Sequence, residues 1–247
     1  MKLLAIDGNS IMNRAFYGIK MLSNKKGMFT NALTGFMNIY LKSVSEVKPD
    51  CAAVAFDLKA PTFRHKADAS YKANRKGMPE ELHMQMPVIK DILRAMGIAV
   101  LECEGFEADD ILGTLARISE ENGSSCFIST GDRDSLQLIS DNVTVRLATT
   151  KETIIYDKER FTADYGFPPI NLIDLKALMG DSSDNISGVP GIGEKTASAL
   201  IGKYLTIENI YADLDAVECT KSVRTKLENG RSAAENSKFL ATIVKNA

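Results

Sequence analysis

The sequence has few of the residues that build zinc sites and thiol chemistry. It contains four cysteines and two histidines, and no two cysteines form a C-x-x-C pair. Cys51 and Cys126 lie in apolar runs, so we expect both to be small core residues. Unpaired cysteines of this kind are typical of proteins in a reducing, cytoplasmic compartment.

Long hydrophobic runs are also missing. The apolar residues 3–6 are interrupted at once by Asp7, which makes the run too short for a signal peptide. No other stretch approaches the length needed to cross a bilayer. We therefore expect a protein without a membrane partner.

An excess of positive charge is missing as well. The formal net charge is −2, whereas nucleic-acid-binding domains usually carry a positive excess. The charges are unevenly distributed, however, because residues 59–76 hold six basic side chains and only one acid, Asp68. Without nine of the 32 acidic residues, which are described below as candidate metal ligands, the 30 basic residues are in excess by seven. An acidic total can therefore conceal a basic surface beside a metal site.

The chain has the pattern of an α/β domain followed by a helical region. Its 247 residues suit one large domain or two small ones. Strands are predicted at 2–7, 52–57, 98–102, 125–130 and 143–147, and helices at 31–47, 79–96 and 107–121. This alternation predicts a mostly parallel sheet covered by helices, over residues 1–165. Residues 166–247 show helical and turn patterns only.

Acidic residues recur where the predicted strands end. Seven follow four strands and two lie in the helical region: Asp7, Asp57, Glu107, Asp109, Asp110, Asp132, Asp134, Asp181 and Asp184. Ligands of open parallel sheets bind outside the carboxyl ends of the strands. Carboxylates crowded there need cations, and oxygen ligands without His or Cys suit Mg²⁺ or Mn²⁺, here two or more ions. Such a site supports metal-assisted displacement at phosphorus.

Each acid also has an ordinary structural interpretation. A single Asp after a strand is most often a turn former or a helix N-cap, and Asp134 before Ser135 fits that role. For any one position this interpretation is favoured about two to one on such preferences. Caps need one acid each, however, and do not explain the paired motifs Glu107-x-Asp109-Asp110 and Asp132-x-Asp134.

A basic segment follows the second predicted strand. In residues 61–77, basic side chains alternate with Phe63 and Tyr71, a mixture that suits phosphate contacts and base stacking. The alternative is a solvated helix surface, which is the commoner meaning of a charge run. The position beside the predicted acidic edge favours the functional interpretation.

A glycine-rich turn lies in the helical region. Gly188, Gly191, Gly193 and Lys195 match neither G-x-G-x-x-G nor the phosphate-binding G-x-x-x-x-G-K-[ST] pattern. The turn opens a predicted helix over 194–204, which favours a helix-hairpin-helix whose backbone N–H groups face a DNA phosphate. As a bare pattern it also fits an ordinary turn between two helices.

Together these motifs resemble a known family. The motifs in question are Asp7-Gly-Asn-Ser, Phe56-Asp57, Tyr71-Lys72-Ala-Asn-Arg75, Gly105-Phe-Glu107-Ala-Asp109-Asp110, Thr130-Gly-Asp132-Arg-Asp134 and Gly180-Asp181-Ser-Ser-Asp184-Asn185. In this order, and over the whole chain, they resemble the 5′-nuclease domains of bacterial DNA polymerases I, within the flap endonuclease family. The resemblance implies a Rossmann-like (PIN-like) sheet and a bacterial, cytoplasmic protein.

The resemblance also implies roles for individual residues. All nine carboxylates would be metal ligands, directly or through water, and Lys72 and Arg75 would act at the scissile phosphate. Tyr71 would stack on a terminal base, while Arg14 and Arg64 would face the DNA strand. Residues 71–96 would form a helical arch, and the hairpin with Gly188, Gly191, Gly193 and Lys195 would bind DNA together with a K⁺ ion.

The implied activity is hydrolysis of DNA at 5′ flaps, overhangs and nicks, during replication and repair. The expected protein is a monomer that is fused to, or cooperates with, a DNA polymerase. Two alternatives stay open: a DNA-junction binder without activity, and a PIN-like ribonuclease. A phosphatase with an Asp nucleophile would need Asp-x-Asp after the first strand, and Asp7-Gly-Asn lacks it.

Overall fold

The computed structural model describes residues 1–149 and 151–247. The chain forms two compact units, each built from more than one segment. Unit 1 contains Met1–Thr62, Lys76–Asp157 and Ile243–Ala247, and unit 2 contains Phe63–Arg75 and Lys158–Thr242. The predicted single boundary near residue 165 does not account for residues 63–75, which group with the helical unit, or for the last five residues, which group with unit 1.

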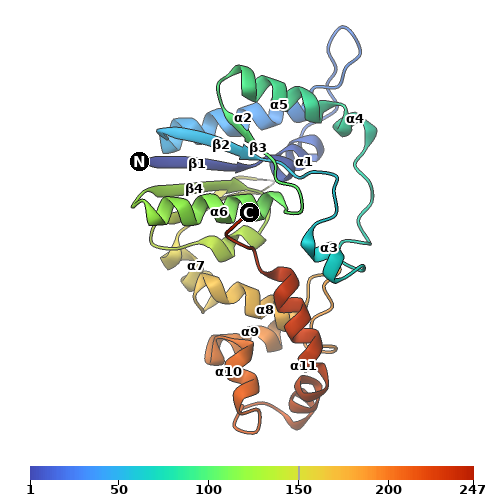
Figure 1. Cartoon of the computed structure of the whole chain (residues 1–247), viewed down its shortest axis with the longest axis vertical. Coiled ribbons are helices and arrows are strands. Elements are labelled where there is room, and N and C mark those ends of the chain that lie inside the picture. Colours follow the sequence, from blue (N-terminus) through green and yellow to red (C-terminus); the bar gives the residue numbers. More distant parts are fainter. Residues whose placement is uncertain (150) are drawn as a thin grey trace. The chain divides into compact units, whose positions relative to one another are not determined.

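Unit 1 is organised around a six-stranded sheet (Figure 1). The strands are β1 (Lys2–Asp7), β2 (Cys51–Ala55), β3 (Ala99–Leu101), β4 (Ser125–Thr130), β5 (Val143–Ala148) and β6 (Thr153–Tyr156), in the order β3-β2-β1-β4-β5-β6. All neighbouring pairs are parallel except β5 and β6, which are antiparallel. The strand order reverses between β1 and β4, which is where open parallel sheets bind ligands.

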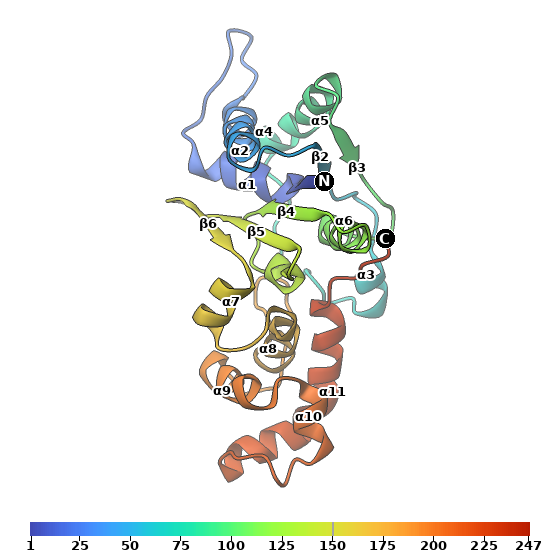
Figure 2. The same cartoon turned by 90° about the vertical axis from the view of Figure 1, so that its left-hand side faces the viewer.

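Helices cover both faces of this sheet. On one face lie α1 (Gly8–Gly18), α2 (Asn31–Val47), α4 (Glu80–His83) and α5 (Gln85–Ala95), and on the other lies α6 (Ala108–Glu121) (Figure 2). A 3₁₀ turn, η1 (Asp134–Leu138), follows β4. Leu4, Ile6 and Val54 alternate along β1 and β2 and pack with Phe36 and Ile89 into one buried core. The central strands β1 and β2 are buried on both faces, as is typical of parallel sheets covered by helices.

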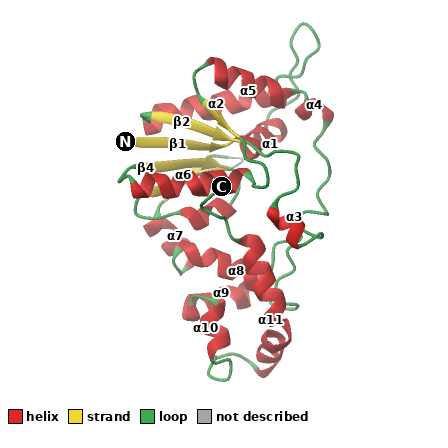
Figure 3. Ribbon diagram, viewed as in Figure 1, coloured by secondary structure: helices red, strands yellow, loops and turns green. Residues whose placement is uncertain are grey.

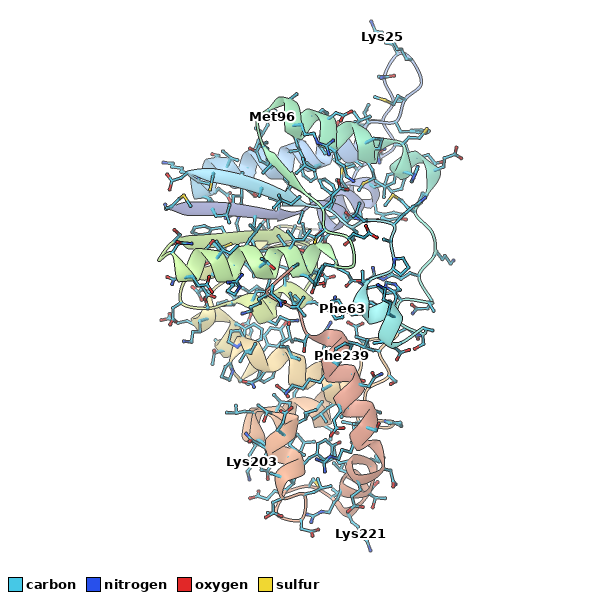
Figure 4. The ribbon with its side chains drawn as sticks, viewed as in Figure 1. Lys25, Phe63, Met96, Lys203, Lys221 and Phe239 are labelled. Carbon is cyan, nitrogen blue, oxygen red and sulfur yellow. The ribbon has the colours of Figure 1, made fainter. Side chains whose placement is uncertain are left out.

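Unit 2 is helical (Figure 3). It contains α3 (Phe63–Ala67), α7 (Lys158–Tyr165), the 3₁₀ turn η2 (Pro169–Asn171), α8 (Leu172–Met179), α9 (Glu194–Tyr204), α10 (Ile207–Ala212) and α11 (Lys221–Ala241). Phe63 of α3 and Phe239 of α11 point towards each other (Figure 4), with ring centroids 5.8 Å apart. None of the helices that the structure describes is long and apolar enough to cross a membrane.

Several predicted elements agree with the structure and others need correction. The bounds of β1, β4, α2 and α9 are those predicted. The predicted helix 79–96 is two helices, α4 and α5, joined at Met84. No helix is present at residues 71–79, so the arch segment is not continuously helical. Cys126 is buried as expected, but Cys51 is exposed because it lies at the very start of β2.

Candidate active site

The ends of β1 and β4 bring Asp7 and Asp132 to the point where the sheet order reverses. Asp7 is the last residue of β1, and Asp132 lies two residues beyond β4. The hydroxyl of Thr130 donates to Asp7 Oδ2 (2.9 Å), and Thr130 Oγ1 in turn accepts from the Asp132 N–H (3.0 Å). Thr130 therefore fixes both acidic residues relative to the sheet.

Negative charge accumulates at Asp7, whose carboxylate accepts hydrogen bonds from the Ser10 N–H and the Thr130 hydroxyl. Asp7 is only 5% exposed. Burial raises the pKa of Asp7 to about 7, and the charges of Asp57 and Asp132 add to the rise, against hydrogen bonds from Ser10 and Thr130. A carboxylate whose ionisation is this costly is stabilised by a bound cation. The site therefore has the donor chemistry of a hard divalent ion.

The other acids of unit 1 are held around the same end of the sheet by α6 and η1. Asp57 Oδ1 accepts from the Ala108 N–H at the start of α6 (2.7 Å). Asp109 Oδ1 accepts from the Ser135 hydroxyl (3.0 Å). Asp110 is fully buried, and its Oδ2 accepts from the Glu107 N–H (3.0 Å) in the manner of a capping box.

Several of these acids also cap helices, so the structural and functional interpretations are not exclusive. Asp7 accepts from the Ser10 N–H and caps α1, and Glu107 is the N-cap residue of α6. Asp132 Oδ1 accepts from the Asp134 N–H at the start of η1. Asp134 itself is the first residue of η1, and the N-cap position belongs to Arg133. Capping orients the carboxylates, but it does not by itself assemble an ion site. Among residues 1–149 and 151–247, no three acidic, His or Cys side chains converge closely enough to hold an ion as they stand.

Arg14 lies on α1 beside this cluster. It lines a cavity of about 770 Å³ together with Ser10, Tyr17 and Asn38. Burial lowers the pKa of its guanidinium. Ser10 also accepts from the Gly131 N–H (2.9 Å), which connects the start of α1 to the end of β4. The predicted DNA-facing Arg14 is thus open to a cavity of unit 1.

The two remaining acids, Asp181 and Asp184, belong to unit 2 and have cationic partners of their own. Lys176 Nζ donates to Asp181 Oδ2 (2.5 Å). Although burial acts to raise it, the pKa of Asp181 is lowered to about 2 by the charge and hydrogen bond of Lys176 and by hydrogen bonds from Ser183. Lys176 belongs to no sequence motif, and only its place five residues before Asp181, in the last turn of α8, could have indicated this pairing.

Asp184 has two basic partners, and they are the residues predicted to be catalytic. Lys72 Nζ lies 3.7 Å from Asp184 Oδ2, and Arg75 Nη2 donates to Asp184 Oδ1. Lys72 has a left-handed backbone conformation (φ 55°), and its N–H donates to the Asp184 carbonyl (2.8 Å). The turn from 71 to 75 is thereby fixed to the loop that carries Asp184.

Two residues that were expected to contact DNA are buried instead. Arg64 is 2% exposed, because its guanidinium donates to the carbonyls of Leu240 (2.9 Å) and Thr242 (2.6 Å). Tyr71 is 3% exposed and packs against Ile186 and Leu240. Neither side chain is exposed to a DNA strand in this structure, and the expected contacts of Arg64 and Tyr71 with DNA stay predictions.

The glycine-rich turn joins α8 to α9. Gly188 and Gly191 have positive φ angles (62° and 79°), which favour glycine. A Cβ on Gly188 would lie 2.2 Å from the Gly180 nitrogen, so this position also requires glycine for space. Gly193 caps α9, and Lys195 is exposed in its first turn. Lys226 Nζ donates to the Gly191 carbonyl (3.0 Å), which places a positive charge at the turn.

Comparison with known proteins defines the class of protein. Residues 2–166 match the model of the 5'-3' exonuclease N-terminal resolvase-like domain, and residues 167–247 match that of the 5'-3' exonuclease C-terminal SAM fold. The chain therefore belongs to the 5'-3' exonuclease family.

Among its relatives are DNA polymerase I of Caldicellulosiruptor bescii, 45% identical over 99% of this chain, and that of Bacillus subtilis, 44% identical over 100% of it. The chain spans 29% and 28% of the length of these two relatives.

Solved structures share the fold at lower identity. The T5 5'-exonuclease with bound zinc ions is 21% identical with a TM-score of 0.79, over 98% of this chain and 89% of that one. The catalytic core of Rad2 in complex with a DNA substrate is 18% identical with a TM-score of 0.58, over 93% of this chain and 73% of that one. At these identities the likeness shows the fold alone.

Proposed function

We propose that the chain is a divalent-metal-dependent 5′ nuclease that hydrolyses DNA at 5′ flaps, overhangs and nicks, with a role in replication and repair. The observation that carries this proposal is the acidic cluster around Asp7, whose pKa is raised to about 7 beside Asp57 and Asp132. Membership of the 5'-3' exonuclease family supports it. The polymerase relatives favour cooperation with, or fusion to, a DNA polymerase.

The metal site in this proposal uses oxygen donors only. The unit 1 donors are Asp7, Asp57, Glu107, Asp109, Asp110, Asp132 and Asp134. Mg²⁺ or Mn²⁺ suits such donors, and two ions of this kind would activate water and stabilise the attacking and leaving oxygens of the phosphodiester. Thr130 and the N–H groups at the starts of α1 and α6 hold the carboxylates in orientation. Asp181 and Asp184 stay predicted ligands from unit 2.

Lys72 and Arg75 are proposed to contact the scissile phosphate. Both now neutralise Asp184, so each would exchange a carboxylate oxygen for a phosphate oxygen when DNA binds. Replacing one anionic partner of a Lys or Arg by another costs less free energy than burying a charge that had no partner before. Positive charge beside the phosphate stabilises the negative charge that develops during displacement.

The DNA duplex is proposed to contact the glycine-rich turn and Arg14. The N-terminus of α9 directs backbone N–H groups towards the glycine-rich turn, and Lys195 adds an exposed charge. These groups bind phosphate without distinguishing sequence. A K⁺ ion at this turn is part of the proposal. The Gly191 carbonyl of the turn already accepts a hydrogen bond from a cationic group, Lys226 Nζ. Arg64 and Tyr71 act as scaffold for α11 and the 71–75 turn.

A cleavage assay tests the proposal and its alternatives. A 5′-flap DNA labelled at its 5′ end is incubated with excess protein in Mg²⁺, in Ca²⁺ and in EDTA, beside a matched RNA. We expect cutting of the DNA in Mg²⁺, binding without cutting in Ca²⁺, and no cutting in EDTA, because Ca²⁺ is larger and its coordination is looser. Binding without cutting in Mg²⁺ would indicate a junction-binding protein, and preferential cutting of the RNA would indicate a ribonuclease.

A further inference from the structure

The last five residues, Ile243–Ala247, pack on α6 and η1 of unit 1, and we call them the tail. The Ile243 N–H donates to Gln137 Oε1 (2.9 Å), and the Ala247 N–H donates to Thr114 Oγ1 (2.9 Å). The Lys245 carbonyl accepts from Arg117 Nε (2.6 Å). Ile243 is 6% exposed. The tail is therefore held along its length by side chains of η1 and α6.

Gly113 of α6 provides the space that the tail occupies. A Cβ at position 113 would lie 2.8 Å from Ile243 Cγ2 and 2.8 Å from the Val244 carbonyl oxygen. A glycine inside a helix destabilises that helix relative to alanine, so a small side chain such as that of alanine is normally preferred there. The close approach of the tail explains why this helical position carries none.

The tail also contacts one of the predicted metal ligands. The Val244 N–H donates to Asp110 Oδ1 (3.0 Å), while the Glu107 N–H donates to Oδ2 (3.0 Å). Asp110 is fully buried. Its carboxylate is thus oriented by two backbone donors, one local to α6 and one that is 134 residues away in the sequence.

We propose that the tail is a positioning element of the metal site, which acts through the Val244 N–H on Asp110. The inference rests on the proposed metal-dependent nuclease function. Partners that orient metal-binding carboxylates typically contribute ten- to a hundredfold to metal affinity or activity. Without the tail, the Asp110 carboxylate loses one of its two backbone donors and the acidic cluster binds divalent ions more weakly.

Two variants with matched controls separate this role from simple stabilisation. Val244→Pro removes the N–H donor and Val244→Ala retains it, because only proline lacks a backbone N–H. Gly113→Ala displaces the tail from α6, while Gly202→Ala places the same methyl group on a helical glycine of α9 with no atom within 4 Å. Gly113→Ala also serves if the proline prevents folding.

Isothermal titration with Mn²⁺ alone, on folded protein well below its melting temperature, measures the affinity without any need for cleavage. We expect Val244→Pro and Gly113→Ala to weaken Mn²⁺ binding about tenfold or more, and both controls to stay within about twofold of the parental protein. Hydrogen exchange of the tail amides verifies that Gly113→Ala releases the tail.

The inference would be overturned if Val244→Pro, or Gly113→Ala with a released tail, bound Mn²⁺ within about twofold of the parental affinity. The proposed metal site itself would be unaffected by that result. Failure of the parental protein itself to bind Mn²⁺ would instead overturn the metal site, and the inference with it.

Discussion

The acidic residues of the two units have opposite electrostatic surroundings. In unit 1, Asp7 is buried beside Asp57 and Asp132, and its pKa is raised to about 7. In unit 2, Asp181 and Asp184 are paired with Lys176, Lys72 and Arg75, and the pKa of Asp181 is lowered to about 2. Both sets lie in motifs that resemble the same metal-binding family. The acids of unit 2 are thus neutralised by Lys and Arg side chains of the same unit, whereas those beside Asp7 in unit 1 would be neutralised by the divalent ions proposed above.

The largest effect is expected from Asp132→Asn. The asparagine Oδ1 can still accept from the Asp134 N–H, so the fold should persist while one ligand charge is lost. Single-turnover cleavage of 5′-flap DNA should fall on the order of a thousandfold or more. The matched control is Asp91→Asn, a surface acid of α5 whose side chain is 78% exposed. Near-normal cleavage by Asp132→Asn in saturating Mg²⁺ would contradict the assignment of this acid.

Asp110→Asn is a less clean test, because both Asp110 oxygens accept backbone N–H groups. An asparagine NH₂ would face one of these donors, so this substitution should also lower stability.

Lys72→Ala tests the role of the basic side chains that pair with the acids of unit 2. If Lys72 acts at the scissile phosphate, single-turnover cleavage should fall about a hundredfold, while equilibrium binding of flap DNA changes far less. Lys42→Ala provides the comparison, since the Lys42 side chain is 58% exposed and lies 3.9 Å from Glu46. Enzyme excess prevents product release from masking the chemical step. Cleavage at the parental rate once DNA is saturated would remove Lys72 from the catalytic residues.

Asp7→Asn should stabilise the protein in EDTA. The pKa of Asp7 is raised from 3.8 to about 7, so ionising this carboxyl costs the folded state stability as pH rises from about 4 to about 7. The variant should therefore gain about 2 kcal/mol over the parental protein at pH 8 and little at pH 4. Urea unfolding at the two pH values measures the gain, with Asp91→Asn as control. A loss of stability at pH 8 would show that Asp7 is already neutralised.

Lys176→Met should have the smallest effect and the opposite sign. The lowered pKa of Asp181 contributes stability that is present above pH 4 and is lost as pH falls through about 2. Removing Lys176 should cost about 1 kcal/mol at pH 7, less than the full shift implies because solvent screens the pair. Lys203→Met, at an exposed ion pair with Glu218, is the control. Equal unfolding free energies of Lys176→Met and parent at pH 7 would remove the contrast between the units.

The sequence predicted those parts of the fold that depend on local pattern. The short apolar runs of β1 and β4, the helical pattern of α2 and the glycine-rich turn before α9 lie where they were expected. The carboxylates after β1 and β4 also lie at the predicted end of the sheet. Their relation follows from strand direction alone, because parallel strands end at the same edge.

Contacts between distant segments were not predictable in the same way. The neighbours of Arg64 in the sequence are those of an exposed basic residue. Its side chain is nevertheless buried against the carbonyls of Leu240 and Thr242, at the end of α11. Tyr71 is covered by residues more than a hundred positions away. The tail contacts Asp110 through the backbone N–H of Val244, and a backbone donor cannot be recognised from the type of residue at that position. Such contacts depend on tertiary packing rather than on spacing.

The most direct test of the central claim is an anomalous-diffraction measurement on crystals grown with Mn²⁺. The account predicts Mn²⁺ peaks at direct coordination distance, about 2 Å, from carboxylate oxygens of Asp7 and Asp132 in unit 1. A map with saturating Mn²⁺ and no peak beside these two residues would contradict the account.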